Sequence, residues 1–212
     1  IVLGYGAYFP SKGHVGRLTQ YETLFTGLQY MGYARAKHPY MGVGRNLAYR
    51  KKLFMEHNGF SGFIGEKAGD DDLFVNHTAT STNTAVVSTP QSVTWSKPKT
   101  SFRDWYLQRR RHLGVSPMYT TATKWRLLVE PMTRGLMYVV LILLLVAGTW
   151  QVRVVVAAAY LVRLLLQYAV LHNGARRLGG ATVPFLSIMW FDVMMPLLTL
   201  WLMAHPQRRN QY

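Results

Sequence analysis

The stretch that decides the fold is GLMYVVLILLLVAGTW, residues 135–150, which contains no charged side chain. Two further apolar stretches follow at residues 152–171 and 182–204. A helix rises about 1.5 Å per residue, so roughly 20 apolar residues span a hydrocarbon core of about 30 Å. The three stretches predict a membrane region with two or three helices. A buried helical core in a soluble protein is the alternative, but the tryptophans among the stretches favour a bilayer.

Charged residues within and beside these stretches predict their surroundings. Arg163 lies near the middle of the second stretch. Placing an arginine at the centre of a membrane helix costs about 2.5–3.5 kcal/mol of insertion free energy, so Arg163 must face protein, water or headgroups. Positively charged residues next to membrane helices tend to lie on the cytoplasmic side. We therefore predict that the helix ends beside Arg134 and beside residues 176–177 are cytoplasmic. We therefore predict a multi-pass protein of the cell membrane whose preceding part is cytoplasmic. Because the third stretch contains Pro184 and Pro196, a broken or re-entrant segment is the alternative to a full membrane crossing there.

The first 130 residues are polar and basic, with 17 Lys and Arg against 8 Asp and Glu. This excess suits anionic partners such as nucleic acid, lipid headgroups or a phosphate-bearing substrate. The basic residues lie next to the apolar stretches and form no separate module, which argues against nucleic acid. The chain has no cysteine, and its seven histidines show no paired ligand spacing. We therefore predict no disulfide and no metal-binding residues in this sequence.

Strand and helix patterns alternate in this polar part and predict an α/β layer. We expect strands at residues 1–8, 85–88 and 93–96, and helices at 14–36, 53–57, 70–78, 102–113 and 120–129. The last helix is amphipathic and leads to the membrane. We divide the chain into residues 1–116, an interfacial helix over 117–133 and a membrane region over 134–212. The strand-like start at Ile1, without a leader peptide, predicts a part of a longer polypeptide.

An acidic cluster, Asp70, Asp71 and Asp72, follows Gly69. Crowded carboxylates repel one another, so at least one can have a raised pKa that suits proton transfer. The alternative is a solvated helix N-terminus, where acids interact favourably with the helix dipole.

A basic helix carries Gln108, Arg111 and His112 at spacings that place them on one face. Such a face can bind a diphosphate through charge-assisted hydrogen bonds. The alternative is a basic patch against anionic lipids, and we predict that role for Arg109 and Arg110.

A glycine-rich turn contains Gly42, Gly44, Arg45 and Asn46. It is an incomplete nucleotide-binding motif, because Leu47 occupies the position of the last glycine. Its physical use is to bring the backbone close to a bulky ligand, and an ordinary loop is the alternative.

The order of these three motifs before the apolar stretches resembles the family 2 glycosyltransferases of the cellulose, hyaluronan and poly-N-acetylglucosamine synthase type. The resemblance covers most of residues 1–150. It implies the C-terminal part of a GT-A-type, Rossmann-like catalytic domain followed by transmembrane α-helices. It also implies an inverting hexosyltransferase that moves a sugar from a nucleotide-sugar donor to a glycan or lipid-linked acceptor.

The family's motifs assign roles to particular residues. Gly69, Asp70 and Asp71 match G-D-D, which implies that Asp71 is the general base and that Asp70 contacts substrate. Gln108 and Arg111 match Q-x-x-R, which implies that they help to bind the nucleotide diphosphate and the acceptor. His112 stands where the family has Trp, and its imidazole can still pack against a sugar ring of the substrate. The glycine turn adds Gly44 and Arg45 as substrate-binding residues.

The resemblance further implies a divalent cation, Mg²⁺ or Mn²⁺. Its ligands, the D-x-D motif among them, belong to an N-terminal half that has no counterpart in these 212 residues. We therefore expect this part alone to be inactive. The competing hypothesis is a non-catalytic membrane adaptor whose basic face binds lipid or another subunit, and it predicts that Asp71 is dispensable.

Overall fold

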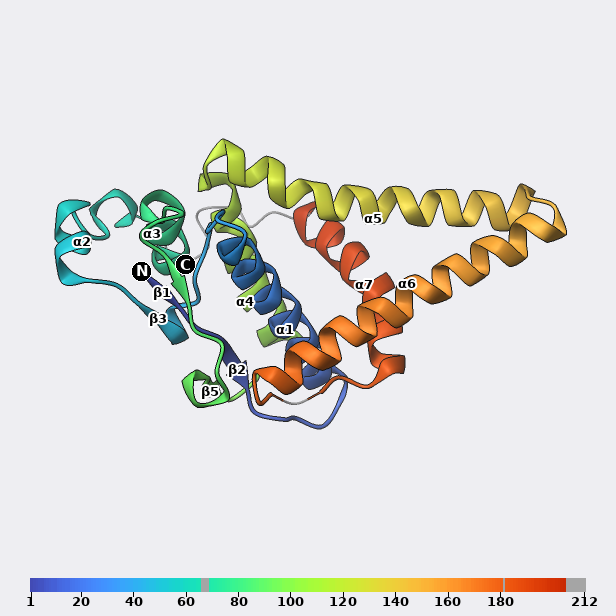
Figure 1. The fold of residues 1–212 in the computed structure, drawn as a ribbon, viewed down its shortest axis with the longest axis horizontal. Coiled ribbons are helices and arrows are strands. Elements are labelled where there is room, and N and C mark those ends of the chain that lie inside the picture. The colour runs from blue at the N-terminus through green and yellow to red at the C-terminus, as the bar shows by residue number, and fades with distance from the viewer. Residues whose placement is uncertain (66–68, 181, 205–212) are drawn as a thin grey trace.

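The computed structural model describes residues 1–65, 69–180 and 182–204, and most of them are helical. Two long helices, α5 (Thr121–Ala147) and α6 (Trp150–Arg177), meet at the turn around Gly148 and diverge toward a mixed helix and strand body (Figure 1). A third apolar helix, α7 (Phe185–Ala204), lies near the body between them. The molecule therefore has a polar end and a helical arm.

The strands are short and form two small sheets. They are β1 (Val2–Leu3), β2 (Gly6–Tyr8), β3 (Leu47–Ala48), β4 (Ala85–Val86) and β5 (Thr94–Ser96). β1 pairs antiparallel with β3 and parallel with β4, while β2 pairs parallel with β5. The α/β prediction is thus right in coarse terms, but the Rossmann-like sheet that we expected is small.

The strand expected over residues 1–8 is interrupted between β1 and β2. The Gly4 N–H donates to the Asn46 carbonyl at 2.9 Å, and the Asn46 amide donates to the carbonyls of Tyr5 at 2.9 Å and Ser92 at 2.6 Å. A Cβ at residue 4 would lie 2.3 Å from the Asn46 side-chain oxygen. Glycine is therefore required where this side chain crosses the strand.

Helix α1 (His14–Arg35) is the central element of the body. Its Tyr30 hydroxyl donates to the Gly4 carbonyl at 2.6 Å. Gly27 lets the Tyr5 ring approach, because a Cβ there would lie 2.6 Å from a ring carbon of Tyr5. These contacts join α1 to the strands, and its other sides contact α4, α6 and α7.

The remaining helices of the body are α2 (Lys51–Glu56), α3 (Asp70–Thr78) and α4 (Phe102–Val115). They match the expected helices, with ends that differ by a few residues. Ser101 caps α4, since its hydroxyl accepts from the Asp104 N–H at 3.1 Å. Asn76 of α3 accepts at its side-chain oxygen from the Thr120 N–H at 2.8 Å, which attaches α3 to the start of α5.

The interfacial helix and the first apolar stretch form one continuous helix, α5, although we expected a boundary near residue 133. Pro131 lies inside this helix and cannot donate a backbone hydrogen bond. The Thr133 hydroxyl donates to the carbonyls of Val129 at 2.8 Å and Glu130 at 3.0 Å, so polar groups remain paired near the proline.

Three helical segments are long and apolar enough to cross a membrane: Thr121–Ala147, Trp150–Arg177 and Phe185–Leu202. Large apolar side chains on them, such as Val146, Leu166 and Leu186, are exposed. Uncovered apolar surface of this extent is typical of a lipid-facing region. Pro196 lies inside α7 without ending it, and the cytoplasmic orientation stays a prediction.

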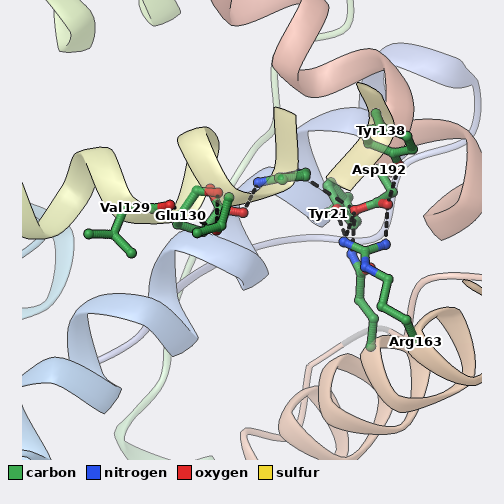
Figure 2. A network of polar contacts seen from close by, with 9 residues as sticks. Tyr21, Val129, Glu130, Tyr138, Arg163 and Asp192 are labelled. Atoms are coloured by element: carbon green, nitrogen blue, oxygen red, sulfur yellow. Dashed lines mark hydrogen bonds and ion pairs between the residues drawn. The ribbon is translucent and has the colours of Figure 1, made fainter. Parts of the chain in front are cut away.

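A charged network joins the three apolar helices around Asp192 of α7, whose side chain is 0 % exposed (Figure 2). Arg163 of α6 contacts both carboxylate oxygens, one of them at 3.0 Å. Tyr138 of α5 donates to the carboxylate at 2.5 Å, Gln167 of α6 donates at 3.0 Å, and Arg134 of α5 lies 3.5 Å away. Of the three surroundings predicted for Arg163, which were protein, water or headgroups, the structure shows protein.

The same network reaches α1. The Gln167 amide donates to the Tyr21 hydroxyl at 3.2 Å, and the Tyr21 ring packs 5.4 Å from that of Phe191 in α7. The Arg134 guanidinium lies 5.4 Å from the centroid of the Phe25 ring. The central helix of the body is therefore attached directly to the apolar helices.

Candidate active site

A pocket of about 440 Å³ lies between α1, the glycine turn, the start of α3 and one face of α4. All seven residues that the sequence analysis selected line it: Gly44, Arg45, Asp70, Asp71, Gln108, Arg111 and His112. Residues up to 68 positions apart in the chain are thus brought together, and their chemical roles stay predictions.

The acidic turn depends on the backbone of Gly69. Its φ of 88° is left-handed, and a Cβ there would lie 2.4 Å from a methyl group of Val115. Glycine therefore lets the first turn of α3 approach the end of α4. Asp70, Asp71 and Asp72 form this turn, close to the basic face.

Backbone N–H groups hold the Asp71 carboxylate from two sides. One oxygen accepts from the Gly44 N–H at 2.5 Å, and the other accepts from the Asp72 N–H at 3.0 Å. A Cβ at residue 44 would lie 2.7 Å from the first of these oxygens. The glycine turn therefore positions the acid that we predict to be the base.

Asp72 also lines the pocket but is only 6 % exposed, and its carboxylate lies 3.4 Å from the Tyr119 hydroxyl. Burial, with the neighbouring Asp71 charge as a smaller cause, raises the pKa of Asp72 to about 8. Asp72 therefore holds a proton at neutral pH, whereas the half-buried Asp71 is accessible from the pocket.

Arg45 lines the pocket, but its guanidinium is largely used to hold β2. It donates to the carbonyls of Ala7 at 2.9 Å and Gly6 at 2.8 Å, and it lies 4.2 Å from the centroid of the Tyr8 ring. Arg45 therefore has a structural role, and its contact with substrate stays a prediction.

Helix α4 presents Gln108, Arg111 and His112 to the pocket, as their spacing predicted. The Gln108 amide donates to the Tyr8 hydroxyl at 3.0 Å, which fixes its orientation. Arg111 is exposed and has no ion pair with any residue that the structure describes. Reduced solvation, followed by the charge of Arg109, lowers the pKa of His112.

The prediction that Arg109 contacts lipid headgroups is wrong. Arg109 lines the pocket and forms an ion pair with Glu22 of α1. Arg110 instead donates to the Tyr106 hydroxyl at 2.8 Å, and the Tyr106 ring packs 5.3 Å from that of Trp201 in α7. A lipid contact therefore stays a prediction for Arg110 alone.

The sequence analysis also missed the wall that α1 contributes. Thr19, Glu22, Thr23 and Thr26 line the pocket, and Trp105 of α4 lies opposite Glu22. The signal was present, because these α1 residues recur every three or four positions. Their shared polar character on one face of α1 could have identified the wall.

No group of three or more potential metal ligands occurs within residues 1–65, 69–180 and 182–204. Both Asp71 oxygens accept backbone N–H groups, and Asp72 faces Tyr119 inside the protein. The described residues therefore do not fit the divalent cation that the family resemblance implies.

The pocket thus brings an acidic turn and the polar face of a basic helix together, next to helices that are long and apolar enough to cross a membrane. The family model described as glycosyl transferase family group 2 matches residues 3–204, so the chain belongs to this family. A search of curated proteins finds no match.

Proposed function

We propose that the protein takes part in inverting transfer of a hexose from a nucleotide-sugar donor to a glycan or lipid-linked acceptor. We place the reaction at the cytoplasmic face of the cell membrane. The observation that supports this proposal best is that the acidic turn and the Q-x-x-R face line one pocket. The family supports the transfer of a sugar, and the exposed apolar helices support the membrane setting.

In the proposed reaction the acceptor hydroxyl oxygen attacks the anomeric carbon of the donor sugar. The bond from that carbon to the diphosphate oxygen breaks, and the hydroxyl proton passes to Asp71. Arg111 stabilises the charge that develops on the departing diphosphate, and Gln108 adds a hydrogen bond. Attack opposite the leaving group inverts the anomeric centre and requires no covalent intermediate with the protein.

The divalent cation implied by the family would supply further positive charge at the diphosphate. We expect its ligands in a part of the polypeptide other than the residues described here.

The deciding experiment is the substitution Asp71→Asn in the full-length protein, assayed in membranes by transfer from a panel of labelled nucleotide-sugars. Loss of a general base typically costs about 10²–10⁴-fold in rate, and we expect a loss in this range. Asp104→Asn is the matched control, because Asp104 is exposed at the start of α4 and does not line the pocket. Full activity in Asp71→Asn would refute Asp71 as the base, whereas absence of transfer by the natural protein with every donor would favour the adaptor hypothesis.

A further inference from the structure

The α1 wall of the pocket carries one carboxylate, that of Glu22, among three threonines. The side chain of Glu22 is 14 % exposed. One of its oxygens accepts from the Trp105 indole N–H at 2.9 Å, and the other is ion-paired with Arg109. Two residues of α4 therefore fix the orientation of this carboxylate.

Arg109 has a polar atom without a partner at this position. Its Nε is buried and forms no hydrogen bond with any residue that the structure describes, although the side chain lines the pocket. Buried N–H groups in native proteins are almost always paired with protein, water or ligand. Because this N–H is itself inaccessible, a ligand in the pocket reaches Arg109 through the exposed part of its side chain, which is 23 %.

Arg109 and Arg111 differ in whether their positive charge is free to bind an anionic ligand. The Glu22 carboxylate neutralises Arg109, whereas Arg111 is exposed and has no ion pair within the described part of the chain. An unpaired guanidinium suits a diphosphate. A neutralised pair provides both hydrogen-bond donors and acceptors without net charge, and this combination suits the hydroxyl groups of a sugar.

We infer that Glu22 and Arg109 form a further substrate-binding pair, which recognises an uncharged, hydroxyl-rich saccharide acceptor beside Asp71. Arg111, in contrast, binds the diphosphate of the donor. This inference rests on the proposed function and names the substrate class of the acceptor side. It also explains why the arginine at the first variable position of the Q-x-x-R motif lines the pocket.

The test measures binding directly in the detergent-solubilised, full-length protein. The probes are uridine diphosphate and a panel of neutral oligosaccharides of glucose, galactose and N-acetylglucosamine, titrated by calorimetry. Arg109→Lys keeps the positive charge beside Glu22 but removes the planar guanidinium and its several hydrogen-bond donors. We expect it to weaken saccharide binding about tenfold or more, as for loss of a hydrogen bond to a charged group. We expect binding of the diphosphate to change less than about twofold.

Arg110→Lys is the matched control, since Arg110 is the next residue and does not line the pocket. It should leave the binding of both probes unchanged. Thr23→Val is the second variant, because it alters the same wall without touching the ion pair, and it should weaken saccharide binding several-fold. Its result decides the inference if Arg109→Lys fails to fold.

The outcomes separate this inference from the proposed function. Saccharide binding that is absent in the natural protein, or unchanged in both pocket variants, overturns the inference even if sugar transfer is observed. Saccharide binding that depends on Arg109 and Thr23 supports the inference even if no donor is transferred. Weakened diphosphate binding with normal saccharide binding in Arg109→Lys would assign Arg109 to the donor and overturn the inference as well.

Discussion

Replacing Asp192 by asparagine should destabilise the helical arm strongly, because the shape is kept and the charge is lost. Asp192 is completely buried, and it neutralises Arg163, whose side chain is 32 % exposed, and Arg134, which is 10 % exposed. Glu130 also pairs with Arg134, so the substitution leaves about one uncompensated positive charge. Removing one partner of a buried ion pair typically costs about 3–5 kcal/mol. Partial exposure of Arg163 places our expectation near the lower value, about 3 kcal/mol.

The assay is reversible unfolding of the full-length protein in mixed detergent micelles, followed by circular dichroism. Arg153→Gln is the control, since Arg153 lies on the same helix as Arg163, is exposed and contacts only the Val146 carbonyl among the interactions of the described residues. It should cost less than about 1 kcal/mol. The double variant Asp192→Asn with Arg163→Gln should recover part of the loss, because it removes the uncompensated charge. A loss below about 1 kcal/mol in Asp192→Asn, or additive losses in the double variant, would refute this account of the network.

Three further predictions concern the pocket. Gly44→Ala should reduce sugar transfer at least about tenfold with the protein still folded, because the new Cβ would lie 2.7 Å from an Asp71 oxygen; unchanged transfer would show that the turn does not position the acid. Arg111→Lys should reduce transfer strongly by losing the two-pronged geometry toward diphosphate, whereas Arg110→Lys should be mild, and equal activity of the two would contradict the role of Arg111. Finally, the pKa of Asp72 is about 8 in the folded protein, compared with 3.8 for an ordinary aspartate. The folded state therefore binds the proton more tightly than the unfolded state, and this binding stabilises the fold fully below pH 3.8. The stabilisation is lost as the pH rises through about 8. Asp72→Asn should flatten the fall in unfolding free energy over that range, and an unchanged pH profile in chemical denaturation would argue against a protonated Asp72.

Local sequence determined the helical elements, including the three that are long and apolar enough to cross a membrane. A run such as residues 135–150 is apolar on every face, so its preference for a hydrocarbon environment does not depend on distant residues. The spacing of Gln108, Arg111 and His112 likewise depends only on helix geometry, which is why all three were predicted correctly on the pocket side of α4. The order of the motifs was enough to predict the family.

Tertiary structure alone decided which charges are paired. Arg163 and Asp192 are 29 residues apart, and the Trp105 to Glu22 hydrogen bond joins residues 83 apart. A sequence shows that a charge in an apolar helix needs a partner, but which one it meets depends on how the helices pack. For the same reason the sequence predicted a lipid contact for Arg109, whereas in the structure Arg109 pairs with Glu22. The expected strand over residues 1–8 is divided by the Asn46 side chain, a contact from a distant turn that no local pattern encodes.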